Sequence, residues 1–141
     1  MPGTLKGSRR QSREAALQAL YLIDVCRVKR GEFPAGYWSE EPLTPKALQF
    51  AEHLVAGTLA ELEPIDQTIM RYAKNWELDR MAAVDRSLLR LAAFELLRDL
   101  ETPVNVIINE AIEIAKQYST AESSKFVNGI LDKVKEERKS P

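Results

Sequence analysis

The sequence of 141 residues contains one cysteine, Cys26, and one histidine, His53. A single cysteine excludes an internal disulfide and fits a reducing compartment. One histidine leaves too few soft ligands for a zinc site. No apolar run approaches the roughly 18 residues that a membrane-spanning helix needs, and a glycine-rich phosphate loop is absent. These gaps argue against a disulfide scaffold, a membrane protein, a zinc protein and a P-loop enzyme.

Catalysis finds little support in the residues that are present. A nucleophile–base pair would need Cys26 or a serine beside His53, and both lie within predicted apolar helices where nothing activates them. Four carboxylates on two helices could in principle meet at a metal ion: Asp85, Glu95, Glu110 and Glu113. Because no histidine and no repeated ligand spacing accompanies them, we disfavour a metal site there. We expect Glu95 and Asn109 instead to pair with backbone groups between helices. We therefore predict no enzymatic activity, cofactor or metal.

The N-terminus superficially resembles a twin-arginine export signal, because Arg9 and Arg10 precede an apolar stretch. However, Gln18 interrupts that stretch, Asp24 follows it closely, and its periodicity is helical. We therefore expect no export and place the protein in the cytoplasm.

Hydrophobic periodicity predicts helices along the whole chain and no strand. The first helix is expected from Ser8 or Arg9 to about Lys29, followed by a loop at 31–44. Later helices are expected to start at caps or prolines: Thr44–Pro45, Pro64, Thr102–Pro103 and Ser119–Thr120. Asp79 should cap the segment before the central helix. The predicted fold is all-α, one compact domain of two three-helix subdomains, 8–76 and 77–136.

The stretch from 84 to 99 has too wide an apolar surface for a helix at the edge of a bundle. We predict that a central helix from about Met81 to Leu100 is the most buried element. Its polar residues narrow to a strip of Arg86, Arg90 and Arg98. The expected core consists of apolar side chains from this helix and its neighbours: Leu88, Leu89, Ala92, Leu96, Ile112 and Ile130.

A net charge of −1 conceals an uneven distribution. Residues 1–30 hold seven basic and two acidic side chains, whereas residues 31–79 hold three basic and nine acidic ones. Arg9, Arg10 and Arg13 cluster in the first helical turn, where the helix dipole disfavours cations by a few tenths of a kcal/mol each. This placement suggests a role other than helix stability, and an anion-binding face would account for it.

Aromatic and basic residues elsewhere extend this pattern. Tyr21 follows the arginines on the first helix, and Lys125 and Phe126 open the last one. Single-stranded RNA is held in this manner, with cations on phosphates and aromatic faces under unstacked bases. Taken singly, Tyr21 and Phe126 are more typical of core or half-buried positions, and only their combination with the arginine cluster favours RNA binding.

Four segments carry a close resemblance to a known family: 9–21 (RRQSREAALQALY), 76–97 (WELDRMAAVDRSLLRLAAFELL), 109–118 (NEAIEIAKQY) and 125–132 (KFVNGILD). The chain resembles the bacterial transcription antitermination factor NusB over nearly its whole length, the 31–44 loop and the tail excepted. Two positions depart from relatives: Gln11, where some carry a third consecutive arginine, and Glu122, where others carry aspartate or asparagine.

The resemblance implies two three-helix subdomains and a partner, NusE, which is also a small ribosomal subunit protein. It implies that both bind boxA RNA in nascent transcripts and help RNA polymerase, within its antitermination complex, to read through terminators, notably in ribosomal RNA operons. The RNA-facing residues would be Arg9, Arg10, Arg13, Tyr21, Tyr72, Lys125 and Phe126. Asp85 and Arg86 would face the protein partner, with charges that need no internal partner.

Two alternatives remain. A similar helical domain forms the N-terminal part of certain ribosomal RNA cytosine methyltransferases, so the chain would then be a fragment of an enzyme. The other alternative is a scaffold that binds only proteins. The sequence also leaves open whether the protein forms a homodimer, which could bury the arginine face.

Overall fold

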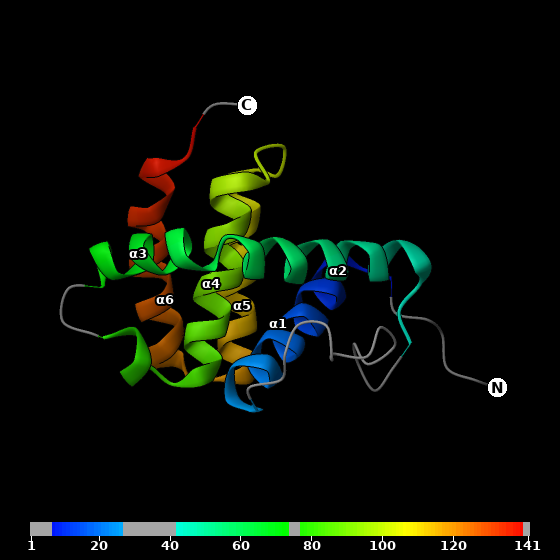
Figure 1. The fold of residues 1–141 in the computed structure, drawn as a ribbon, viewed down its shortest axis with the longest axis horizontal. Coiled ribbons are helices and arrows are strands. Elements are labelled where there is room, and N and C mark those ends of the chain that lie inside the picture. The colour runs from blue at the N-terminus through cyan, green and yellow to red at the C-terminus, as the bar shows by residue number, and fades with distance from the viewer. Residues whose placement is uncertain (1–6, 27–41, 74–76, 140–141) are drawn as a thin grey trace.

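The computed structural model describes residues 7–26, 42–73 and 77–139. These ranges form six α-helices and two short 3₁₀ helices, with no β-strand, so the predicted all-α class is confirmed (Figure 1). The elements are α1 (Arg9–Cys26), α2 (Pro45–Ala60), α3 (Leu62–Tyr72), η2 (Leu78–Arg80), α4 (Ala83–Arg98), α5 (Val104–Tyr118), α6 (Ala121–Val134) and η3 (Lys135–Glu137). The end of the first predicted helix beyond Cys26, most of the 31–44 loop and Trp76 lie outside the described residues.

Helix α4 lies at the centre and packs against all five other α-helices (Figure 1). Ten of its sixteen residues are buried, so the predicted central helix is confirmed. Five of the six predicted core residues are also buried: Leu88, Leu89, Ala92, Leu96 and Ile130. Ile112 is only partly buried, because α5 turns Ile108, Ala111 and Ala115 inward and leaves Ile112 at the edge of that face.

Two predicted helix starts are confirmed by their caps. The Thr44 hydroxyl accepts a hydrogen bond from the Ala47 amide at 3.2 Å, with Pro45 at the first helical position. The Thr120 hydroxyl accepts one from the Ser123 amide at 2.9 Å and starts α6. In both helices the side chain satisfies an amide that has no partner within the helix.

Three other predicted boundaries are shifted. Helix α3 begins at Leu62, two residues before Pro64, because a proline in the first turn removes an amide that needs no intrahelical partner. Helix α5 begins after Pro103, which itself occupies the cap position. Asp79 is not a cap, since it lies inside η2, and Ala82 precedes α4.

Helices α2 and α4 approach closely at Gly57. A Cβ atom at this position would overlap the ring of Phe94, with Cζ as the nearest atom, so only glycine leaves room for the phenyl ring. The contact allows α2 to lie across α4 (Figure 1).

One continuous apolar core joins residues of α1, α2 and α3 to those of α4, α5 and α6. The two predicted halves therefore share a core, and their division near residue 77 stays a prediction. No helix within the described ranges is long and apolar enough to cross a membrane.

Candidate nucleic-acid interface

The first turn of α1 presents two arginines at the surface. Arg9 is exposed, and its guanidinium carbon lies 3.9 Å from the ring centroid of Phe50 on α2, a cation–π contact. Arg10 is partly exposed, and its Nε atom donates to Oε2 of Glu110 on α5. Tyr21 is half-buried on the same helix. It follows Arg10 by eleven residues, about three turns, so the two lie on the same face.

Arg13 does not face solvent, and the expectation that it does is wrong. Its side chain is 4% exposed, and its Nε and Nη2 atoms donate to the two carboxylate oxygens of Glu95 on α4 at 2.9 and 2.8 Å. Burial alone would lower the pKa of Arg13, but the hydrogen bond and charge of Glu95 more than offset it and raise the pKa. Arg13 therefore stays charged inside the core, where a phosphate cannot reach it.

The spacing of α1 explains this burial. Arg13 precedes the buried residues Leu17 and Leu20 by four and seven positions, which places it on the apolar face. Glu95 likewise stands among buried apolar residues of α4. Its expected role as a partner for backbone groups is wrong, because it pairs with a side chain 82 positions away. The sequence contains a signal for this pair, because a basic residue stands on the apolar face of α1 and an acidic residue stands on the apolar face of α4.

Lys125 and Phe126 lie in the second turn of α6. Lys125 is exposed, and Phe126 is half-buried against the core. Phe126 also lines a pocket of about 420 Å³ between the starts of α4 and α6, together with Arg80, Met81, Ala82, Asp85, Glu122 and Ser123. The sequence prediction assigns Phe126 to RNA and Asp85 to a protein, and the structure places them at one hollow.

Asp85 is buried, with 7% of its surface exposed, so the expectation that its charge needs no internal partner is wrong. Its Oδ2 atom accepts a hydrogen bond from the Ser123 hydroxyl at 2.9 Å. Its Oδ1 atom is also buried and has no hydrogen-bond partner among the described residues. A buried carboxylate oxygen without a donor is costly, so Asp85 is held at a cost beside the pocket that it lines with Phe126.

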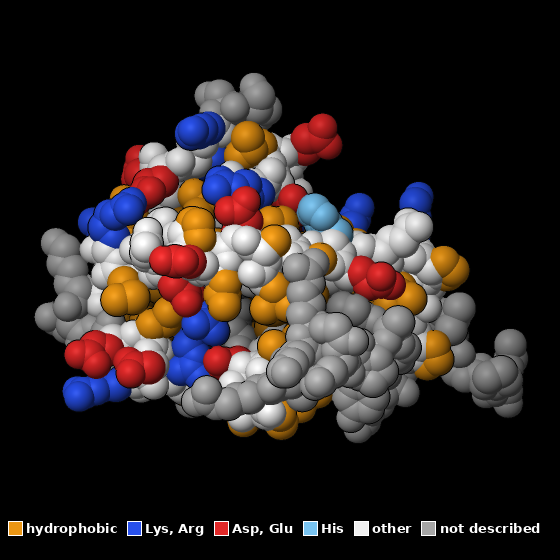
Figure 2. All heavy atoms as spheres, viewed as in Figure 1, with side chains coloured by type: hydrophobic (Ala, Val, Ile, Leu, Met, Phe, Trp, Pro, Cys, Tyr) orange, Lys and Arg blue, Asp and Glu red, His pale blue; other side chains and the backbone are white. Residues whose placement is uncertain are grey.

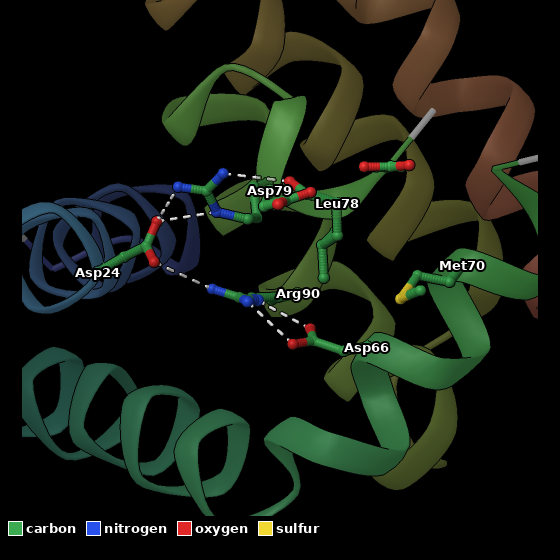
Figure 3. A pocket seen from close by; sticks show the side chains of 8 residues that line it. Asp24, Asp66, Met70, Leu78, Asp79 and Arg90 are labelled. Carbon is green, nitrogen blue, oxygen red and sulfur yellow. Dashed lines mark hydrogen bonds and ion pairs between the residues drawn. The ribbon is translucent and has the colours of Figure 1, made fainter. Parts of the chain in front are cut away.

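Arg86 is paired internally, so the expectation of a free charge is wrong here too. Its Nε atom donates to Asp24 on α1 at 2.9 Å, and its Nη1 atom donates to the carbonyls of Leu78 and Met81 at 3.1 and 3.2 Å. Asp24 pairs with both Arg86 and Arg90 (Figure 3). Arg86 thereby fixes η2 and the entry to α4, and its side chain is 14% exposed.

Arg90 continues this network to α3. Its Nε and Nη2 atoms donate to both carboxylate oxygens of Asp66 at 2.8 and 2.9 Å (Figure 3). Acidic and basic side chains are intermixed over the described part of this face, with no large patch of one sign (Figure 2). The network therefore ties α1, α3 and α4 together and offers no concentrated positive charge to a phosphate backbone.

Tyr72 lies at the end of α3, at the opposite side of the molecule from the start of α1 (Figure 1). Its hydroxyl donates to Oε2 of Glu137 at 2.6 Å, and Arg71 pairs with the same carboxylate. The hydrogen bond to Glu137, then burial, raises the pKa of Tyr72. Arg71, followed by Tyr72, lowers the pKa of Glu137. The structure does not bring Tyr72 together with Arg9 and Arg10.

Comparison with known proteins identifies the family. The model of the NusB family matches residues 10–136, which is most of the chain. The chain belongs to the NusB family. The transcription antitermination protein NusB of Anaeromyxobacter dehalogenans (strain 2CP-1) is 49% identical over 127 residues, 89% of each chain. That of Elusimicrobium minutum (strain Pei191) is 44% identical over 138 residues, 95% of this chain and 97% of the relative.

Solved NusB structures share the fold. T. maritima NusB superposes with a TM-score of 0.87 at 41% identity, covering 97% of this chain and 96% of that one. A structure of the antitermination factors NusB and NusE in complex with dsRNA gives a TM-score of 0.75 at 28% identity, covering 91% and 96%. The resemblance deduced from the sequence is thus confirmed, whereas the roles of the individual residues stay predictions.

Proposed function

We propose that this NusB-family chain acts with NusE to bind boxA RNA in nascent transcripts in the cytoplasm and promotes read-through by RNA polymerase, notably of ribosomal RNA operons. In this proposal the protein is a binding factor and not an enzyme. The observation that carries the proposal is that Arg10 and Tyr21 share one face of α1 and remain accessible, with Arg9 beside them. Cations can hold phosphates on this face while the aromatic ring supports an unstacked base.

The RNA surface that we propose includes four of the residues predicted from the sequence and excludes a fifth, Arg13. Arg9, Arg10, Tyr21 and Lys125 are exposed or half-buried and suit RNA contact. Arg13 does not contact phosphates in this proposal, because it is buried against Glu95. It serves the surface indirectly, by fixing α1 on α4.

The two other predicted RNA contacts, Phe126 and Tyr72, each have another neighbour that affects how they could contact RNA. Phe126 presents part of its ring at the pocket beside Asp85, so a base there would lie next to the proposed protein partner. Tyr72 would join the surface only if the strand extended to the far end of α3, where Glu137 now holds its hydroxyl.

For NusE we propose a contact at the start of α4. The partner would bind in the pocket beside Phe126, and the Asp85 side chain would have to turn toward the pocket before its unpaired Oδ1 atom could accept a hydrogen bond from the partner. Arg86 contributes by positioning η2, since its own donors are already used.

One experiment tests the proposal. Labelled boxA RNA is titrated into the protein at several salt concentrations, with and without NusE, while the mass of the complexes is followed in solution. We expect affinity to fall steeply with salt and to rise when NusE is present. A protein that retains no RNA at low salt would instead be a scaffold. The mass also decides whether a homodimer competes with RNA.

A further inference from the structure

Helix α3 carries an exposed methionine, Met70, on its outer face. The buried residues of this helix face the core: Ile65, Thr68 and Ile69. Met70 follows Glu63 by seven positions and Gln67 by three, so it shares the opposite face with these exposed polar residues. It is 53% exposed. An amphipathic helix normally places polar side chains on that face, so packing of the core does not account for Met70.

Two hollows flank Met70 along α3. The first, of about 650 Å³, lies between α3, η2, α4 and the end of α1, and the Met70 and Leu78 side chains project into it (Figure 3). The second, of about 640 Å³, lies where α2 ends and α3 begins, with Leu59 and Leu62 in its wall. Both hollows are lined by Met70 and Asp66, so they form one continuous depression, which we call the α3 groove.

Carboxylates outnumber arginines around the α3 groove. Two arginines, Arg86 and Arg90, line it together with five carboxylates, which leaves a net charge of −3: Asp24, Glu63, Asp66, Glu77 and Asp79. The arginine side chains are only 14% exposed and are paired with Asp24 and Asp66. The acidic excess therefore lies at the rim, where an approaching ligand meets it first.

The rim charges stand on both sides of the methionine. Glu63 lines the second hollow and Asp79 the first, whereas Met70 lines both. Glu63 and Asp79 are exposed and have no ion-pair partner among the described residues. Seven helical positions separate Glu63 from Met70, about 10 Å along α3. The α3 groove thus presents an apolar centre between two available carboxylates.

We propose that the α3 groove is a docking surface for a basic segment of a protein other than NusE, in which an apolar side chain stands between arginine or lysine residues. The apolar side chain packs on Met70 and Leu78, and the flanking cations reach Glu63 and Asp79. Methionine suits such a contact, because its flexible thioether adapts to the shape of a partner. The negative net charge of the groove repels phosphates, which favours a protein over RNA as the occupant.

The α3 groove and the pocket proposed for NusE open on different sides of α4. Asp85 lines that pocket and accepts a hydrogen bond from Ser123 of α6. Arg86, the next residue, lines the groove and pairs with Asp24 of α1. Consecutive residues of a helix point about 100° apart, at 3.6 residues per turn. A partner can therefore occupy one hollow and leave the other accessible.

The test uses a fluorescein-labelled synthetic peptide in which leucine alternates with arginine, titrated into the full chain. Met70→Ser should weaken its binding about tenfold, because the apolar contact is lost. Met70→Leu should stay close to the parental affinity, since it keeps an apolar side chain of similar size. The matched control is Val106→Ser, at an aliphatic side chain that is 42% exposed on α5, and it should leave the affinity unchanged. Thermal melts show that each variant remains folded.

A second pair of variants tests the charges. Glu63→Gln with Asp79→Asn should weaken peptide binding roughly three- to tenfold and flatten its salt dependence, because both rim carboxylates are gone. The control, Glu52→Gln with Glu101→Gln, removes two exposed carboxylates of α2 and of the α4–α5 connection. It should keep the parental salt dependence.

Hydrogen exchange locates the peptide directly, and we expect it to protect α3 and η2 of the parent protein. Saturating NusE should leave the affinity for the peptide unchanged. If NusE displaces the peptide, or if Met70→Ser lowers NusE binding, the groove belongs to the NusE contact and the proposal is overturned. Equal weakening by both pairs of charge variants overturns it as well, since the peptide then follows net charge alone. A homodimer that dissociates in Met70→Ser would instead assign the groove to a second copy of the chain.

Discussion

Arg13 of α1 and Glu95 of α4 form a bidentate ion pair inside the core, with side chains 4% and 2% exposed. The pair joins positions 82 residues apart and holds α1 at a fixed rotation on α4. That rotation leaves Arg10 at the surface, where it pairs with Glu110 of α5, and leaves Tyr21 half-buried. An arginine that looks like a phosphate ligand in the sequence thus orients its neighbours.

The first prediction concerns this pair. Arg13→Met should lower the free energy of unfolding by about 3–5 kcal/mol, because Glu95 would be left charged and unpaired in the core. Denaturant unfolding measures this decrease. The double variant Arg13→Met, Glu95→Leu should recover most of the stability, since both charges are then gone. Near-parental stability of the single variant would contradict the pairing, and a flatter salt dependence of RNA binding would return Arg13 to the phosphate contacts.

The sequence predicts the helices well because their apolar periodicity and caps are local signals. The central helix and the start of α2 at Thr44 follow from that information alone. Pairing across helices does not, because it depends on how α1 is rotated against α4. For this reason the sequence misplaces Arg13 and Asp85 at the surface and does not reveal Glu110 as a partner for Arg10. The family resemblance identifies residue positions, but only the packing shows which side chains remain accessible.

A second prediction concerns the crossing of α2 and α4. Gly57→Ala would place a methyl group against Cζ of Phe94, so we expect the free energy of unfolding to fall by about 1–3 kcal/mol from overpacking. Gly129→Ala on α6 is the matched control. No atom lies within 4 Å of the new methyl group there, and the gain in helix propensity should stabilise the protein by about 0.5–1 kcal/mol. Thermal melts of both variants should therefore shift in opposite directions. Equal shifts would show that the helices have room to separate.

The third prediction is a pH dependence at the end of the chain. Arg71, followed by Tyr72, lowers the pKa of Glu137 below its ordinary value of 4.5. A carboxyl with a lowered folded-state pKa stabilises the fold above its unfolded value, and this contribution disappears as pH falls through the folded value. Hydrogen exchange should therefore report faster opening of η3 in acid. Glu137→Gln should open it at neutral pH, whereas Glu136→Gln, at an exposed neighbour, should retain the parental profile. Identical profiles for both variants would exclude the contact.

The final prediction separates charge from stacking on the proposed RNA surface. Arg9→Ala with Arg10→Ala should weaken boxA RNA binding and flatten the salt dependence by roughly 0.7 units of slope for each phosphate of a single strand that is no longer neutralised. Stability should change by less than about 1 kcal/mol, since both arginines make exposed or partly exposed interactions and oppose the helix dipole. A salt series and a melting curve give both quantities.

Arg98→Ala is the control for the arginine pair. Arg98 is also a surface arginine that pairs with a carboxylate of another helix, Glu61, yet it lies at the end of α4 away from the proposed RNA surface. Its removal should leave the slope unchanged, because a general decrease in positive charge does not alter the number of phosphates that the protein neutralises.

Phe126→Ala should lower affinity at constant slope, as expected for a base that stacks on its ring. If all three variants flatten the slope equally, RNA is bound by net charge alone and the α1 surface has no special role.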